Sequence, residues 1–385
     1  MKRVVLLIAS MLCLQLAFAA NPKIKYGPWI QNVSETGFSV VWTSEHEALA
    51  HVEIAPEDGS VFNACQREKF VQTIAGRRYT GTFHLVNVTG LEPGKKYRYR
   101  IVMKNVEDDM NPYGSVYGVE KTMGEYGAVK TADNSRKECS FVVFNDTHQI
   151  HEKYKKLAEG VDPAKVDLVV FNGDMVSHMT YADSLINHLF NNMKKLTTVV
   201  PSVYARGNHE GRGREWYKFQ DVFPTSTGET YFFKRYGPVG FIVLDGGEDK
   251  PDSSAEYSGT AAYDQFREKE LEWLKEVVKN PDFVSAPVKI AIMHIPALAK
   301  KDSWYSQLWL NEHFTPVLNE AGVDLMLSGH QHTHFLTKPG EFANKFPILV
   351  NSNQERLDVK VTETGIKVNV VDQKGVVIHT YEFAN

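Results

Sequence analysis

Residues 140–148, which read Ser-Phe-Val-Val-Phe-Asn-Asp-Thr-His, decide the fold. The apolar part of this stretch lacks alternation, which is typical of a strand buried on both faces of a sheet. Similar apolar runs recur along the chain, and helical periodicity lies between several of them, most clearly at 264–279. The runs are 166–171, 198–204, 239–244, 288–293 and 323–327. Strands that alternate with helices predict an α/β domain.

Carboxylate, amide or imidazole side chains follow five of these runs. Ligands of α/β sheets gather at the carboxyl ends of strands, so we expect the side chains to converge. In chain order they are Asp146 and His148, Asp174, Asn208 and His209, His294, and His330 and His332. Each motif alone fits a capped turn or a surface histidine as well as a ligand. Five such motifs in order, which offer oxygen and nitrogen donors and no cysteine, together indicate a metal site.

The ordered motifs Asp-x-His, Gly-Asp, Gly-Asn-His-Glu, His and Gly-His-x-His resemble the calcineurin-like metallophosphoesterase superfamily over about residues 140–350. The resemblance implies a four-layer α/β/β/α domain over residues 138–385 with a dinuclear metal centre. One ion would be held by Asp146, His148 and His332, the other by Asn208, His294 and His330. Asp174 would bridge the ions. His209 would be catalytic by assisting the leaving group, and Asp146 would orient it.

Elementary chemistry is consistent with this ligand set. Two cations about 3.5–4 Å apart need a shared anionic ligand, which a carboxylate such as Asp174 supplies. Neutral imidazole and amide donors leave enough positive charge to acidify a bound water. We therefore expect two divalent or trivalent ions, and mixed donors of this kind accept Mn, Fe or Zn without distinguishing among them.

Residues 23–130 lack helical periodicity and predict an all-β sandwich. Residues 37–43 alternate, with apolar side chains on one face, and 51–54, 79–88 and 97–102 are further predicted strands. The run Leu91-Glu92-Pro93-Gly94 before Tyr97 resembles a fibronectin type III-like domain. At the other end of the chain, the segments 346–350, 358–362, 365–371 and 375–381 predict an antiparallel meander.

With its β-domain in front, the chain resembles the purple acid phosphatase branch of the superfamily. The opening residues Tyr26-Gly27-Pro28-Trp29-Ile30 are similar to the start of that branch's N-terminal domain. Two positions depart from it: Ser177 stands where that branch has a tyrosine, and His148 stands where it has no metal-binding histidine. Since the tyrosinate gives those enzymes their colour, we expect a non-purple relative.

Residues 1–20 predict a secretory signal peptide, because Lys2 and Arg3 precede an apolar run that ends in Ala17-Phe18-Ala19-Ala20. The run is shorter than the ~20 residues of a spanning helix. We therefore expect an exported protein, periplasmic or secreted, without a transmembrane anchor. Cys65 and Cys139 remain after export. The sequence is equally consistent with a disulfide bridge between them and with two separate thiols.

Lys plus Arg total 43 against 47 acidic residues, a formal net charge of -4, which does not favour nucleic-acid binding. The leading hypothesis is an exported hydrolase of small phosphorylated substrates that uses a metal-bound hydroxide, with phosphomonoesters favoured. The alternatives are a phosphodiesterase on the same site, or a glycan- or protein-binding protein with a vestigial metal site. The oligomeric state stays open. Weaker hypotheses concern three further places. Arg212 or Arg214 binds phosphate or, as the preferred reading, is a solvated loop charge; Trp304 and Tyr305 shape a leaving-group pocket or pack at a helix start. His334 shares one face with His330 and His332 by strand alternation.

Overall fold

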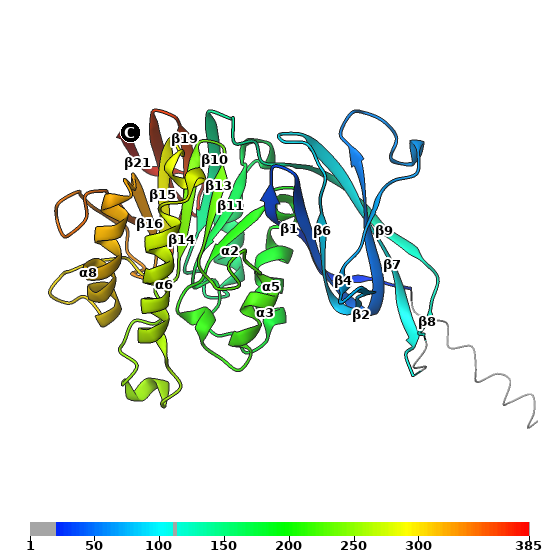
Figure 1. Cartoon of the computed structure of the whole chain (residues 1–385), viewed down its shortest axis with the longest axis horizontal. Helices are drawn as coiled ribbons and strands as arrows, with labels where there is room; N and C mark the ends of the chain where they lie inside the picture. The colour runs from blue at the N-terminus through cyan, green and yellow to red at the C-terminus, as the bar shows by residue number, and fades with distance from the viewer. Residues whose placement is uncertain (1–20, 111–113, 385) are drawn as a thin grey trace, which may run out of the picture.

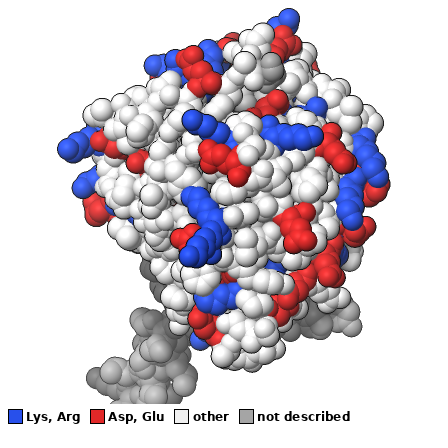
Figure 2. Space-filling view, turned by 90° about the vertical axis from the view of Figure 1, so that its left-hand side faces the viewer, with Lys and Arg blue, Asp and Glu red and all other residues white. Residues whose placement is uncertain are grey.

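The computed structural model describes residues 21–110 and 114–384, so the predicted signal peptide lies outside the described residues. The strands of the N-terminal region lie at one end of the molecule, and the mixed α/β region lies at the other (Figure 1). In the part of the chain described, no helix is long and apolar enough to cross a membrane. On the face in Figure 2, basic and acidic side chains are interspersed.

The N-terminal region is all-β, as predicted. Its strands are β1 (Ile24–Ser34), β2 (Gly37–Pro56), β3 (Lys69–Phe70), β4 (Thr73–Ile74), β5 (Arg77–Arg78), β6 (Thr80–Val88), β7 (Lys96–Asp108), β8 (Val116–Tyr117) and β9 (Lys121–Lys130). The predicted strands 37–43 and 51–54 are wrong as separate elements, because both belong to β2. Exposed polar residues at 45–47 interrupt the apolar pattern, but the backbone continues through a register shift in the pairing with β6.

A 13-stranded sheet runs through both regions. Its α/β part contains β10 (Glu138–Phe144), β11 (Leu168–Asn172), β12 (Ser202–Ala205), β19 (Glu355–Thr362), β20 (Gly365–Asp372) and β21 (Val377–Ala384). Strands β10, β11 and β12 are parallel, whereas β19 to β21 form the predicted antiparallel meander. Strand β1 joins β12 in parallel at Gln31 and Ser202, so the N-terminal region extends the sheet. The predicted strand 198–204 is shorter than expected, since its first residues form a turn.

A second, six-stranded sheet has the order β13-β14-β15-β16-β18-β17. Its strands are β13 (Phe232–Tyr236), β14 (Val239–Leu244), β15 (Val288–Met293), β16 (Leu325–Ser328), β17 (Phe335–Thr337) and β18 (Ile348–Val350). The placement of 346–350 in the meander was wrong, because β18 pairs in parallel with β16. Its side chains are buried without alternation, as a parallel strand covered on both faces requires.

Apolar side chains from the two sheets meet in one core, which includes Phe141 of β10 and Phe241 of β14. A second core lies among α2, α3 and the strands β10 to β12, and a third among α6, α8 and the strands β14 to β16. Trp29 of β1 stacks on Phe190 at 4.1 Å and joins the second core. The helices are α2 (His151–Ala158), α3 (Ala182–Ile186), α4 (Lys194–Thr197), α5 (Phe219–Val222), α6 (Tyr263–Val277), α7 (Pro281–Val284) and α8 (Tyr305–Glu320).

Cys65 and Cys139 are both free, so of the two alternatives for these cysteines the structure has separate thiols. Cys139 lies in the core between the sheets, fully buried, and Cys65 is exposed.

Candidate metal centre

The polar side chains predicted at the strand ends lie together, although the strands belong to two different sheets. Strands β10, β11 and β12 of the large sheet carry Asp146, Asp174 and Asn208 just beyond their carboxyl ends. Strands β15 and β16 of the second sheet carry His294 and His330 in the same way. Parallel strands in each sheet bring their carboxyl ends to one edge, and the two edges meet here.

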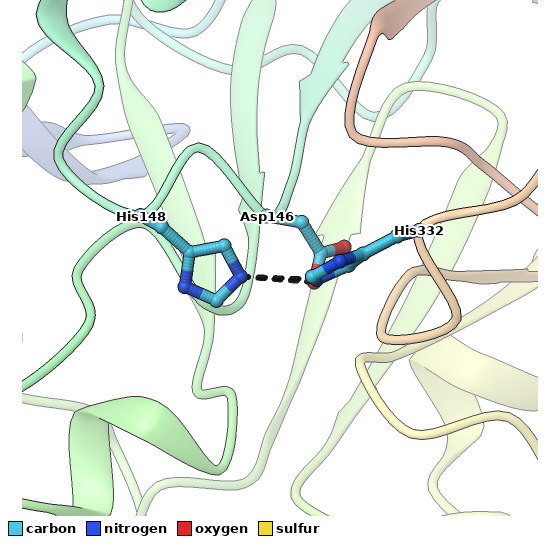
Figure 3. Close-up of side chains that lie close together, drawn as sticks. All are labelled: Asp146, His148 and His332. Carbon is cyan, nitrogen blue, oxygen red and sulfur yellow. Dashed lines mark hydrogen bonds and ion pairs between the residues drawn. The ribbon is translucent and has the colours of Figure 1, made fainter.

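A first group of potential ligand atoms comes from Asp146, His148 and His332, which all lie within 4.8 Å of one another. The three side chains converge from two loops (Figure 3). Nε2 of His332 is 3.2 Å from Oδ1 of Asp146 and 3.0 Å from Nε2 of His148. Two imidazole nitrogens and a carboxylate oxygen at this spacing can share one cation.

A second group contains Asp174, His294 and His330. Nε2 of His294 is 3.0 Å from Oδ2 of Asp174, and Oδ1 of Asn208 is 3.2 Å from Nδ1 of His330. A third group, made by His148, Asp174 and His209, shares His148 with the first group and Asp174 with the second. The third group therefore connects the first group, through His148, with the second group, through Asp174.

Two buried atoms at the centre make no hydrogen bond of standard geometry to the described residues, although each lies 3.0–3.2 Å from a neighbouring side chain of the centre. They are Oδ1 of Asp146 and Nε2 of His294. The other oxygen of Asp146 accepts from the side chain of Asn145 and the backbone N–H of His330. His294 uses Nδ1 to donate to the carbonyl of Asn172 at 2.7 Å. Hydrogen bonds thus fix the outer atoms, and the inner atoms point toward the other potential ligands, as in second-sphere support of metal ligands.

The backbone is strained at this centre. Five of its non-glycine residues have φ between +47° and +69°, a region that side chains other than glycine rarely adopt. They are Asp146, His148, Asp174, His330 and His332. Such strain costs ~1–3 kcal/mol per residue and persists where the surroundings impose it, mostly at functional sites.

The pKa values of the donors also fit cation binding. Burial would lower the pKa of His294, but the carboxylates of Asp174 and Asp146 outweigh it and raise the value to about 10. Burial, together with the neighbouring histidines, lowers the pKa of His148 to about 4. Burial also lowers the pKa of His330 to about 4, so both imidazoles are neutral and able to coordinate. Two buried carboxylates attract a positive charge, and a metal ion can supply it in place of a proton.

Glu210 holds two of the loops in place. It is fully buried and accepts the backbone N–H groups of Asp174, Met175 and Gly207 at 2.9 Å each. Gly207 must be glycine here, since a Cβ would lie 2.3 Å from Oδ1 of Asp174. The sequence motif contained Glu210, but its spacing did not indicate that it joins the β11 and β12 loops.

His209 faces the centre from the β12 loop. Its Nδ1 donates to the carbonyl of Ser177 at 2.9 Å, which leaves Nε2 to accept from Nη1 of Arg212 at 2.9 Å. Its backbone N–H donates to Asp174 at 2.9 Å. These contacts orient His209 through Ser177, Arg212 and Asp174, whereas the sequence hypothesis had assigned that role to Asp146.

Glu248 is a further residue at the centre that the sequence reasoning missed. It is buried, pairs with Arg212 through Nε at 2.6 Å, and lies 3.3 Å from Nδ2 of Asn208. Arg212 is therefore paired, contrary to the expectation of a solvated loop charge. Glu248 follows β14, which corresponds to the predicted run 239–244, so the polar residues after this fourth run were the signal for it.

The structure also bears on the weaker sequence hypotheses for His334 and Trp304. His334 precedes β17 in an irregular segment, so the alternation that placed it beside His332 is wrong. Its Nε2 instead contacts the hydroxyl of Tyr381 at 2.9 Å, and its ring stacks on His379. Trp304 immediately precedes α8, as the helix-start reading predicted.

Paired sheets with Asp, His and Asn donors at their strand ends define a metal-dependent phosphoesterase. The chain belongs to the calcineurin-like phosphoesterase family, which residues 139–334 match. Purple acid phosphatase 15 of Arabidopsis thaliana is 24% identical over 284 residues, 66% of this chain and 49% of that protein. Purple acid phosphatase 23 of the same plant is 24% identical over 153 residues, 37% of this chain and 30% of that protein. This chain thus spans half or less of these relatives' length.

One solved structure similar to this chain is described as GAP50, the anchor in the inner membrane complex of Plasmodium. Its TM-score is 0.48 at 15% identity, over 65% of this chain and 89% of that chain.

Proposed function

We propose that the protein is an exported phosphohydrolase that uses a dinuclear metal centre to hydrolyse phosphate esters, phosphomonoesters in particular. The carrying observation is the set of three donor groups, in which the third group shares His148 with the first and Asp174 with the second. Buried atoms of Asp146 and His294 that make no hydrogen bond face this set. Family membership and similarity to purple acid phosphatases support the reaction class. Export rests on residues 1–20, which lie outside the described part of the chain.

In this proposal, Asp146, His148 and His332 would hold one ion and Asn208, His294 and His330 the other, and Asp174 would be shared between them. The donors are oxygen and nitrogen, which suits Mn, Fe or Zn. When bound, the ions would polarise the phosphate ester and acidify the attacking water.

His209 would assist the leaving group. The hydrogen bond from Nδ1 to Ser177 holds the ring so that Nε2 faces the centre. To donate, Nε2 must carry a proton, and its contact with Nη1 of Arg212 must open through a shift of the imidazole, because the guanidinium is a rigid plane. Glu248 retains the guanidinium through Nε and Nη2, which leaves Nη1 free to bind a phosphoryl oxygen. We therefore assign His209 as general acid and Arg212 as an anion ligand.

We also propose the domain division 1–20, 23–130 and 138–385, with a fibronectin type III-like first domain and a four-layer second domain. The three apolar cores, one between the sheets and one on each outer side, support the four layers.

The test is hydrolysis of p-nitrophenyl phosphate and of bis(p-nitrophenyl) phosphate by protein loaded with Mn, Zn or Fe. We expect turnover with a preference for the monoester. A preference for the bis ester would favour the phosphodiesterase alternative. No turnover of either would refute the proposal and favour a binding protein, although that alternative has to explain why all seven ligands are present.

Three variants locate the chemistry. His209→Ala should keep both ions by elemental analysis and lose most turnover, whereas Asp174→Ala should lose metal. His178→Ala is the matched control, because His178 is an exposed histidine whose ring centre lies 6.3 Å from that of His209. Full activity in His209→Ala, or equal loss in His178→Ala, would overturn the assigned role.

A further inference from the structure

A cavity of about 680 Å³ lies beside the proposed metal centre, between the loop after His209 and the segment that leads into α6. Arg212 and Glu248 form part of its lining. Nη1 of Arg212 is also 2.9 Å from Nε2 of His209, and Glu248 is 3.3 Å from Nδ2 of Asn208. The cavity therefore begins one side chain away from the group assigned to the leaving oxygen.

Aromatic rings line this cavity. Trp216 and Tyr217, which begin the short turn Trp216–Lys218, are 55% and 57% exposed. Tyr257 and Tyr263 line the cavity from the other segment, with ring centres 6.1 Å apart. A tryptophan that is more than half exposed gains little of the free energy that its burial would provide. Large exposed aromatic groups beside a polar site commonly mark ligand contacts.

The charged side chains that line the cavity all have partners of opposite charge among the residues described. An additional phosphate or carboxylate on the substrate would therefore meet no uncompensated cation here. The pairs are Arg206 with Asp245, Arg212 with Glu248, Glu229 with Lys269, and Glu256 with Lys250. Aromatic faces without spare charge favour a neutral ring over an acidic or multiply phosphorylated group.

We propose that this cavity binds the alcohol part of the phosphate ester, and that this alcohol carries a neutral ring that stacks on Trp216. The shared chemistry is a neutral ring with an apolar face, which an aryl alcohol, a nucleoside or a sugar can supply. The proposal rests on the proposed function, because it takes the phosphate to lie at the metal centre with Arg212 between the two sites.

Binding without turnover tests the cavity by itself. Metal-free protein is titrated with adenosine, methyl glucoside, p-nitrobenzyl alcohol and glycerol in a calorimeter. We expect at least one ring compound to bind about tenfold more tightly than glycerol, and Trp216→Ala to abolish that difference. Equal binding of all four compounds, or an unchanged preference in Trp216→Ala, would overturn the proposal. Trp216 is exposed, and circular dichroism verifies that the variant folds.

Selectivity in turnover distinguishes this cavity from the other exposed tryptophan. The ratio of kcat/KM for p-nitrobenzyl phosphate or adenosine 5′-phosphate to that for glycerol 2-phosphate is measured in wild type, Trp216→Ala and Trp304→Ala. Trp304 is 46% exposed and does not line the cavity. We expect the ratio to fall about tenfold in Trp216→Ala and to stay unchanged in Trp304→Ala.

If the kcat/KM ratio falls only in Trp304→Ala, the leaving-group site lies at α8 and the proposal is overturned. Absence of hydrolysis of every ester would refute the proposed function, while the calorimetric result would still decide whether the cavity binds rings.

Discussion

Replacing Glu210 with glutamine tests how the ligand loops are held. Glu210 is fully buried, and one of its oxygens accepts the N–H groups of Asp174 and Gly207 at 2.9 Å each. The other accepts the N–H of Met175 and the hydroxyl of Tyr204, at 2.9 and 2.8 Å. Burial and the nearby Asp174 raise the pKa of Glu210, yet all these partners are donors, which requires the carboxylate.

Glutamine keeps the shape of the side chain but replaces one accepting oxygen with an NH₂ group. The two buried donors that this oxygen accepted then face the NH₂ group, which is itself a donor. Each buried donor left without an acceptor costs ~1–3 kcal/mol. We expect the free energy of unfolding to fall by about 2–6 kcal/mol in guanidinium titrations. Because the strained backbone of Asp174 loses its support, metal content after dialysis should fall as well.

Two control variants calibrate this effect. Tyr204→Phe removes a single donor and leaves the carboxylate bonded to its amides, so we expect a loss of about 1 kcal/mol. Glu276→Gln changes an exposed glutamate that pairs with Lys279, with an expected change of about 0–0.5 kcal/mol. The reasoning is refuted if Glu210→Gln lowers the free energy of unfolding no more than Glu276→Gln does. It is also refuted if Tyr204→Phe lowers it as much as Glu210→Gln does.

Three further predictions concern other parts of the molecule. Burial lowers the pKa of His84 from 6.5 to about 4, so the unfolded chain binds more protons between these values. Stability is then complete above pH 6.5 and falls by about 3 kcal/mol as the pH drops to 4, and denaturation of His84→Phe should lack this part of the pH slope. Asn145→Ala should weaken metal affinity about 10- to 100-fold, because Asn145 fixes the outer oxygen of Asp146, and unchanged affinity by competition with a chelator would contradict this. A thiol reagent should label Cys65 in the native protein and Cys139 only after unfolding; native labelling of neither would indicate a bridge.

Local patterns predicted many elements closely. The expected strands 239–244 and 288–293 coincide with β14 and β15, and the expected helix 264–279 overlaps α6. These segments are continuous apolar runs or a long amphipathic pattern, whose burial follows directly from composition. Errors occurred where pairing partners decide the outcome: β2 continues through a polar stretch, and β18 joins the second sheet.

The sequence by itself determined which donors exist, since the seven proposed ligands and His209 follow buried strands at motif positions. Only the tertiary structure decided how they meet, because their strands lie in two sheets whose edges come together through long-range packing. The same packing brought Glu210, Glu248 and Arg212 to the centre. Their roles depend on contacts between loops up to 40 residues apart, which no periodicity within one segment can encode. The aromatic cavity likewise exists only once the loop after His209 lies against the segment before α6.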